Sequence, residues 1–253
     1  MTTRKNFRRL AIAAALTCVA FGGAGCATPG GLHVYSLAST AHETVHDSGP
    51  EGAADMPSFV APNETLMGFA YDPFTDHFFL RLAPGNHFRV VDRPARAIKR
   101  EFNVAELPAT GGGDLAIRPR DGHVFALVPA ESAVVEVTRY GEFVGKIPLE
   151  KIGGPPRGVA FDAAEDRLLI LHGDSSAQIS GHAPDGRQLS RVALDRVIAG
   201  DWLAFDSEKR EFYAPLAGGE SVGVFGEDGK FRRELPLHAT LLDVGPRSFL
   251  RMF

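Results

Sequence analysis

The sequence contains little cysteine and little asparagine. Cys18 and Cys26 are the only cysteines in 253 residues. Cys18 lies in an apolar N-terminal segment, so a chain from which that segment is removed keeps one thiol and has no internal disulfide. Asparagine is equally scarce, with only Asn63, Asn86 and Asn103 after residue 25. We find no recognisable set of metal ligands and no cofactor motif.

Basic clusters are also missing. The chain has 27 basic and 31 acidic residues, and residues 1–25 hold four of the basic and none of the acidic ones. The remainder therefore carries a net charge of about −8, with no run of Lys or Arg that could neutralise successive phosphates. This charge argues against a nucleic-acid partner. The triplet Gly111-Gly112-Gly113 follows a Pro-Ala-Thr turn and not a strand, so it is not a phosphate-binding loop.

No apolar run is long enough to span a bilayer. The run from Leu10 to Phe21 has 12 residues, against about 20 for a membrane-spanning helix. Arg4, Lys5, Arg8 and Arg9 precede it, and small residues follow. This pattern predicts a secretory signal peptide over residues 1–25.

The end of this segment suggests how the protein is anchored. Gly23-Ala24-Gly25-Cys26 resembles the bacterial lipobox, although leucine is the commonest residue where Gly23 stands. The resemblance implies removal of residues 1–25 and lipidation of Cys26, and Ala27 after it implies sorting to the outer membrane, facing the periplasm. Ordinary signal cleavage with a free Cys26 is the alternative.

Four segments of the chain share one pattern. Each has a short apolar strand, a polar turn and a second apolar strand: MGFAYDPFTDHFFLRL, GDLAIRPRDGHVFALV, RGVAFDAAEDRLLIL and DWLAFDSEKREFYAP. The equivalent alanines are Ala70, Ala116, Ala160 and Ala204, at spacings of 46, 44 and 44 residues. Further strand pairs follow three of these segments, with hairpin turns at Tyr140-Gly141, Asp185-Gly186 and Asp228-Gly229. Each unit therefore has four strands.

A four-stranded unit that repeats every 44 residues or so predicts an all-β fold, a β-propeller. The segments GVAFD, DRLLIL and PDGRQLSRVAL resemble NHL-type repeats of exported bacterial propeller lipoproteins. Residues 64–107, 108–152, 153–196 and 197–238 are the expected blades, within a single domain over 26–253. An open β-sandwich is the structural alternative.

The two ends of the chain predict a fifth blade. Residues 239–253 repeat the first half of a unit, and we expect residues 31–45 to supply its third and fourth strands. Pairing them closes the ring and removes two exposed sheet edges. Residues 46–63, rich in Pro, Gly and Ala, are then expected to be a connector.

The stretch HETVH at residues 42–46 matches the H-E-x-x-H motif of zinc proteases. In the expected outermost strand of the fifth blade, His42 and His46 share one face and Glu43 lies on the other. This is not the helical arrangement that binds zinc, so we disfavour a protease.

Propeller ligands usually bind where loops meet at the mouth of the channel. By the resemblance, the candidate binding residues on these loops are Asp201, Trp202, Arg157, Asp114, His172 and Asp174. Trp202, the only tryptophan, is either an aromatic platform for a ligand or a packing residue between blades. The acids are either ligand contacts or solvated loop positions.

Two classes of function remain open. The first is a non-catalytic envelope lipoprotein whose propeller face binds a protein or small ligand. The second is a metal-dependent propeller hydrolase of the gluconolactonase-like type, which holds a divalent metal with Glu, Asn and Asp. We prefer the first, because we cannot match that family's ligands to positions in this chain.

Overall fold

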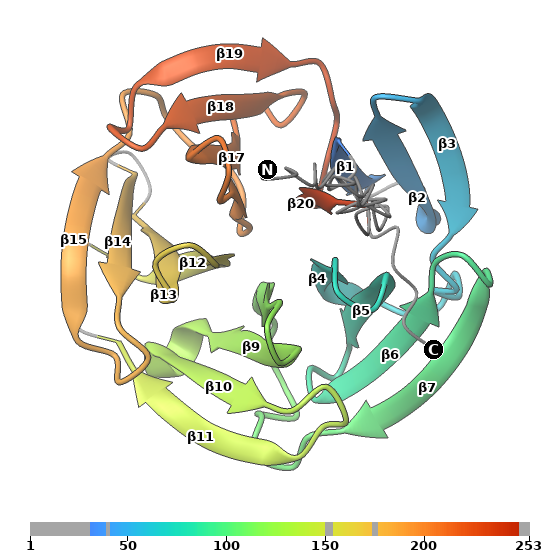
Figure 1. The fold of residues 1–253 in the computed structure, drawn as a ribbon. Coiled ribbons are helices and arrows are strands. Elements are labelled where there is room, and N and C mark those ends of the chain that lie inside the picture. The colour runs from blue at the N-terminus through green and yellow to red at the C-terminus, as the bar shows by residue number, and fades with distance from the viewer. Residues whose placement is uncertain (1–30, 39–40, 150–153, 174–176, 248–253) are drawn as a thin grey trace, which may run out of the picture.

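The computed structural model describes residues 31–38, 41–149, 154–173 and 177–247, which form one ring of five sheets (Figure 1). Each sheet has four strands, so the expected five-bladed β-propeller is confirmed. These residues include one 3-10 helix, Pro129–Glu131. Within them, no helix is long and apolar enough to cross a membrane.

The four blades made from consecutive strands run outward from the channel. Blade 1 consists of β4 (Leu66–Asp72), β5 (His77–Leu82), β6 (His87–Asp92) and β7 (Ala97–Asn103). Blade 2 consists of β8 (Leu115–Arg118), β9 (His123–Val128), β10 (Ala133–Val137) and β11 (Phe143–Pro148). Blade 3 consists of β12 (Pro156–Asp162), β13 (Arg167–His172), β14 (Gln178–His182) and β15 (Gln188–Ala193). Blade 4 consists of β16 (Ala204–Asp206), β17 (Glu211–Pro215), β18 (Val222–Gly226) and β19 (Phe231–Leu235).

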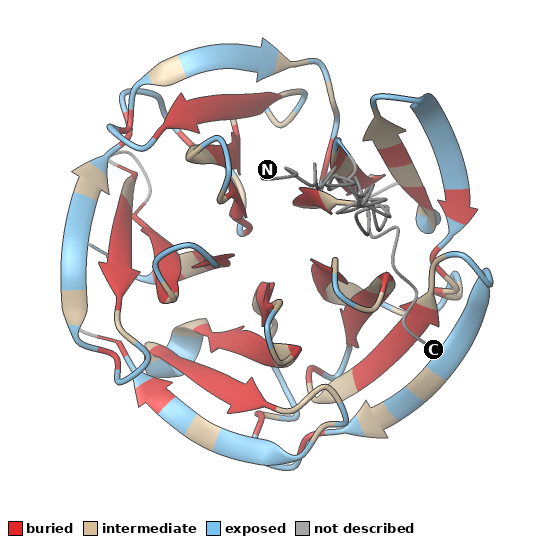
Figure 2. Ribbon diagram, viewed as in Figure 1, coloured by how far each residue is buried: buried red, intermediate tan, exposed pale blue. Residues whose placement is uncertain are grey.

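The hydrophobic core lies between the blades. Inner and middle strands are buried, whereas the outer strands are largely exposed (Figure 2). Between blades 2 and 3, the rings of Phe125 and Phe161 stack with centroids 5.4 Å apart, and Val134 and Ile170 belong to the same cluster. Because each blade buries its apolar faces only against its neighbours, the blades are stable as a ring.

The turns between first and second strands repeat from blade to blade. An aspartate ends the inner strand in three blades; in blade 3, Asp162 Oδ1 accepts a hydrogen bond from the backbone N–H of Ala164 at 3.1 Å. The residue four positions after the end of the inner strand has a positive φ in each case: Asp76 (59°), Gly122 (71°), Asp166 (50°) and Arg210 (58°). The expected outer hairpin turns also form, with left-handed glycines at Gly141, Gly186 and Gly229.

The fifth blade joins the two ends of the chain, but not in the expected proportion. β20 (Leu241–Pro246) is its inner strand, and β1 (Leu32–Ala38), β2 (Ala41–Gly49) and β3 (Gly52–Pro57) follow outward. β20 pairs antiparallel with β1, from Leu32 opposite Pro246 to Leu37 opposite Leu241. The ring thus closes with one C-terminal and three N-terminal strands, and not with two of each.

Two sequence expectations for this blade are corrected by the pairing. β1 is the second strand and not the third, and HETVH lies in β2, which is the third strand and not the outermost. The outermost strand is β3, inside the segment 46–63 that we expected to be a connector. β3 was missed because an outer strand has little to bury: all of its residues except Met56 are exposed, so GAADMP carries no apolar alternation. The first half of a unit expected over residues 239–253 includes a second strand beginning at Phe249, and this strand lies outside the described residues.

Candidate functional site

A cavity of about 840 Å³ opens at the end of the ring where loops run from each outer strand into the next inner strand. We call this end the lead-in face and the cavity the lead-in pocket. All five blades contribute to its lining: residues 65–67, 112–113, 155–157, 199–202 and 238–241, with Pro129, Pro215 and Gly219. Its size suits a small ligand or a peptide side chain.

The wall of the lead-in pocket has few hydrogen-bond donors. Pro129, Pro155, Pro156 and Pro215 lack a backbone N–H, and their fixed φ angles stiffen the loops that carry them. Met67 adds an adaptable apolar side chain. The pocket therefore presents a firm and mainly apolar surface.

One ion pair lies at this pocket. Arg157 Nε donates to Asp201 Oδ1 at 2.8 Å, joining the lead-in loops of blades 3 and 4. Arg157 Nη1 also donates to the carbonyl oxygen of Gly173 at 3.2 Å. The Arg157 side chain is 19% exposed and that of Asp201 is 79% exposed. Because Asp201 is open to water, this pair adds little to folding stability, and the Asp201 carboxylate is accessible from the pocket.

Trp202 contributes to the lining but is almost entirely buried, at 1% exposure. It belongs to the core cluster that includes Tyr213 of blade 4 and Leu241 of blade 5. Of the two readings of this residue from the sequence, the burial supports packing between blades and not an exposed aromatic platform.

Asp114 holds the inner strands together beside the pocket. It is 2% exposed, and its Oδ2 accepts hydrogen bonds from the backbone N–H groups of Val159 and Leu203, each at 2.9 Å. One carboxyl group thus links blade 2 to blades 3 and 4. Burial raises the pKa of Asp114 well above its ordinary value, and the hydrogen bonds from backbone N–H groups oppose this shift.

The buried guanidinium of Arg81 fixes the same loop from blade 1. Arg81 Nη1 donates to the carbonyl oxygens of Gly113 at 3.2 Å and Leu127 at 2.7 Å. Burial lowers its pKa to about 10, with the charge of Asp114 opposing that shift. Both buried charges therefore have a structural role.

His172 is at the end of β13 and is also buried. Its Nε2 lies 2.7 Å from Ser180 Oγ, which in turn lies 2.7 Å from Nε2 of His182. Burial lowers the pKa of His172 to about 4, so the ring is neutral at pH 7. This chain of polar groups connects two strands inside blade 3.

The structure brings together three of the six candidate residues. Arg157, Asp201 and Trp202 line the lead-in pocket, whereas Asp114 and His172 do not. Asp174 and the lipidation site Cys26 lie outside the described residues. The sequence reasoning missed Met67, the prolines, and the exposed residues His238 and Thr240. For Pro155, His238 and Thr240, the position just before a repeated inner strand was a usable signal.

The zinc-protease match is resolved by local structure. HETVH is in strand β2, as expected, and His46 Nδ1 lies 2.6 Å from Asp55 Oδ1 on the outer strand β3. In the part of the chain that the structure describes, no three His, Cys, Asp or Glu side chains form a group that could hold a metal ion. No ligand set is therefore assigned to these residues.

Comparison with known proteins shows the fold alone. No protein-family profile and no curated protein sequence matches the chain. Solved structures that resemble it include a chain of the nidogen/laminin complex, with 11% identity, a TM-score of 0.58, and coverage of 86% of this chain and 100% of that one. A protein of unknown function from Bacteroides caccae has 11% identity, a TM-score of 0.52 and coverage of 86% and 99%. Glutaminyl cyclase from Myxococcus xanthus has 14% identity, a TM-score of 0.51 and coverage of 72% of each chain.

Proposed function

We propose that this protein is a non-catalytic binding protein of the bacterial cell envelope, and that the lead-in pocket holds its partner. The observation that carries the proposal is the convergence of all five lead-in loops on one apolar pocket beside an ion pair. A proline-rich wall loses little freedom on binding, and such preorganisation favours affinity.

The chemistry of the pocket indicates what it would bind. Apolar groups such as Met67 would contact an apolar body, and the exposed carboxylate of Asp201 would accept hydrogen bonds from donors on the ligand. Arg157 offers a guanidinium that pairs with carboxylates in a fixed geometry. A peptide segment or small molecule with an apolar body and charged groups fits both features.

A metal-dependent hydrolase of the gluconolactonase-like type is the alternative function. Such a site needs several converging oxygen ligands. Among the described residues, Asp201 is the one carboxylate in the lining of the lead-in pocket. Elemental analysis of protein purified without chelator tests this alternative, because stoichiometric calcium or zinc would favour the hydrolase.

A pocket-filling substitution tests the binding proposal. Ala199 is exposed and lines the pocket, so Ala199→Trp should occupy it without disturbing the core. Ala95→Trp is the matched control, in an exposed turn of blade 1. We expect the control to recover the same envelope components as the wild type after crosslinking, and Ala199→Trp to lose them. Equal recovery by both variants would reject the lead-in pocket as the binding site.

We also propose that the repeats are of the NHL type and that Cys26 anchors the protein by lipid to the outer membrane. The 44-residue period and the lipobox-like sequence support these assignments. Gly31 and Leu32 line a cavity at the opposite end of the ring. A tether of six residues from Cys26 to Leu32 reaches at most about 20 Å. The anchor would then hold that end near the membrane and turn the lead-in pocket toward the periplasm.

The anchor is tested by mass spectrometry of the mature N-terminus. A lipid-modified Cys26 is expected, and Cys26→Ala should leave the protein unlipidated. An unmodified mature terminus at another residue would reject the anchor without affecting the binding proposal.

A further inference from the structure

The end of the ring opposite the lead-in pocket carries the turns between first and second strands. Because neighbouring strands are antiparallel, the turns between third and fourth strands lie there too. We call this end the turn face. The described chain also begins here, since Gly31 and Leu32 line the same cavity as Pro73 of blade 1. Phe74 follows Pro73 in the turn, so this part of blade 1 lies beside the start of the N-terminal tether.

Blades 1 and 2 expose aromatic rings on the turn face. Phe74 is 57% exposed in the turn between β4 and β5, and Tyr140 is 66% exposed in the turn between β10 and β11. Single exposed apolar residues are common on protein surfaces. These two rings differ because cationic side chains from both blades join them into one surface.

Two arginines lie over the exposed rings. The guanidinium of Arg139 lies 5.5 Å from the ring centroid of Phe74, and that of Arg100 lies 4.9 Å from the ring centroid of Tyr140. Arg100 Nη2 also donates to the backbone carbonyl oxygen of Arg139 at 2.6 Å. Among the described residues, neither arginine forms an ion pair with a carboxylate. Contacts with aromatic rings hold the two side chains without neutralising them.

Two further cations extend this surface along blade 1. Arg96 lies in the turn between β6 and β7, Lys99 precedes Arg100 in β7, and both are exposed. Glu101, the next residue in β7, is bound by Arg89 at 2.5 Å. We call the whole surface the basic aromatic patch: Phe74, Arg96, Lys99, Arg100, Arg139 and Tyr140. The sequence does not show it as one cluster, because Arg100 and Arg139 are 39 residues apart.

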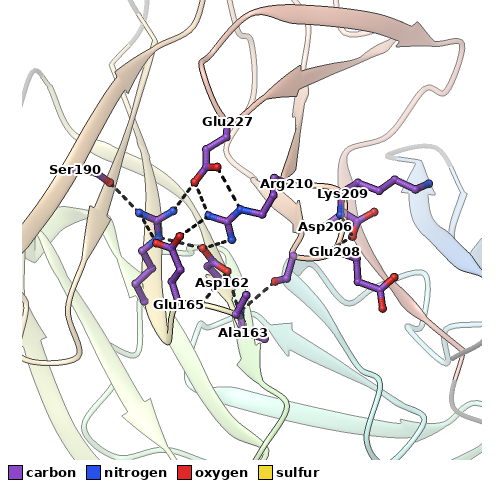
Figure 3. Close-up of polar contacts among 12 residues, drawn as sticks. Asp162, Ala163, Glu165, Ser190, Asp206, Glu208, Lys209, Arg210 and Glu227 are labelled. Atoms are coloured by element: carbon purple, nitrogen blue, oxygen red, sulfur yellow. Dashed lines mark hydrogen bonds and ion pairs between the residues drawn. The ribbon is translucent and has the colours of Figure 1, made fainter. Parts of the chain in front are cut away.

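On blades 3 and 4 the arginines of the turn face are neutralised instead. Arg167 and Arg210 both donate to Asp162 Oδ2, at 3.0 and 2.6 Å, and Glu227 accepts from both arginines (Figure 3). Further exposed carboxylates lie in the turns of these blades: Glu165, Asp185, Glu208 and Asp228. The turn face is therefore polarised, with its available positive charge on blades 1 and 2.

We propose that the basic aromatic patch rests on an anionic phospholipid surface, with the turn face of blades 1 and 2 against the membrane. Lysine and arginine are attracted to anionic headgroups, and aromatic rings favour the interface between headgroups and acyl chains. The carboxylates of blades 3 and 4 lie across the ring from β7 (Figure 1), and salt screens their repulsion beyond about 8 Å.

The membrane contact rests on the proposed lipid anchor for its place in the cell. The tether to Cys26 starts on the turn face, so the anchor would bring the patch to the bilayer. A lipid anchor holds more firmly when a basic patch supplies a second attachment. The lead-in pocket, at the other end of the ring, would stay accessible from the periplasm.

Flotation with vesicles tests this contact. The chain beginning at Ala27 lacks Cys26 and keeps every described residue of the ring, so its result does not depend on whether Cys26 is lipidated. Vesicles of phosphatidylethanolamine with phosphatidylglycerol are compared with vesicles in which phosphatidylcholine replaces the phosphatidylglycerol. We expect binding to the anionic vesicles to be tighter by about tenfold or more, and to weaken at high salt. Equal binding to both kinds of vesicle, or binding to neither, would overturn the proposal.

A charge-removing variant locates the contact. Arg96→Gln combined with Lys99→Gln removes two exposed charges from the patch and should weaken binding to anionic vesicles by about tenfold or more. Lys209→Gln combined with Lys230→Gln makes the same change in net charge on exposed turns of blade 4, and should bind as the unaltered chain does. Undiminished binding by the first pair, or an equal loss in the second, would contradict the assignment to the patch.

The aromatic part of the patch is tested separately. Tyr140→Ser should weaken vesicle binding severalfold, because the ring no longer enters the headgroup interface. Leu189→Ser is the control, since Leu189 is 47% exposed on the outer strand β15 of blade 3. Urea unfolding of each variant checks that the ring is intact. Unchanged binding by Tyr140→Ser would show a purely ionic contact and reject a patch that enters the lipid interface.

Discussion

Replacing Trp202 with alanine should destabilise the whole ring. A fully buried aromatic side chain removes about 150–250 Å² from water. At about 25 cal/mol per Å², the lost burial corresponds to roughly 4–6 kcal/mol. Measured losses for Phe or Trp to Ala in protein cores are about 3–5 kcal/mol. Because Trp202 is 1% exposed and packs with residues of blades 4 and 5, we expect a loss within that range.

The surroundings leave little room for the structure to relax into the space. Gly158 of blade 3 packs against the backbone of Trp202. A Cβ atom on Gly158 would lie only 2.6 Å from the carbonyl carbon of Trp202. The space left by the indole would join the lead-in pocket that Trp202 lines, so we keep the expected cost at about 3–5 kcal/mol. Trp202→Phe, which keeps most of the aromatic volume, should cost clearly less.

Urea unfolding followed by far-ultraviolet circular dichroism measures this loss. With an m-value of about 2 kcal/mol per M, a loss of 4 kcal/mol lowers the midpoint by about 2 M. The m-value itself should stay constant. A midpoint for Trp202→Ala within about 0.3 M of the wild type would refute the assignment of Trp202 to the core and return it to the role of an exposed platform.

Two further predictions concern Asp243 and the closing strand. The pKa of Asp243 is raised from 3.8 to about 7 in the folded state. Between about pH 4 and pH 7 the folded protein therefore holds a proton that the unfolded chain has lost. The free energy of unfolding falls as pH rises through this interval, by up to roughly 4 kcal/mol. Asp243→Asn removes this dependence, so the difference in unfolding free energy between wild type and variant should change across that interval; a difference that is constant with pH contradicts the assignment. Ending the chain at residue 239 removes β20 and exposes the edge of β1, so this truncation should aggregate, whereas ending it at residue 247 should leave a monomeric ring by size-exclusion chromatography.

The sequence predicted the blades because their inner strands are buried. Residues such as Ala160 and Ala204 recur at a fixed spacing since each occupies the same place against the neighbouring blades. The exposed outer strand β3 lacks this constraint, and its sequence was indistinguishable from a linker. Because β3 was not recognised, the number of strands that each end of the chain contributes to the fifth blade could not be deduced.

The candidate sites were only partly predictable for a different reason. Arg157 and Asp201 stand at equivalent positions of successive repeats, so the period itself placed them together. Asp206 and Asp243 belong to the inner strands β16 and β20, and that both line one cavity depends on how the ring closes. The burial of Trp202 likewise depends on Leu241, which is brought to it from the last strand.

The pairing of β1 with β20 also fixes the order in which the molecule can be completed during synthesis. Leu32 and Pro246 face each other although more than 200 residues separate them in the chain. At a translation rate of about 5–20 residues per second, β1 leaves the ribosome roughly 10–40 s before its inner neighbour exists. Throughout that interval its hydrogen-bonding edge has no native partner. The ring of this protein can therefore close only after its last strand has emerged.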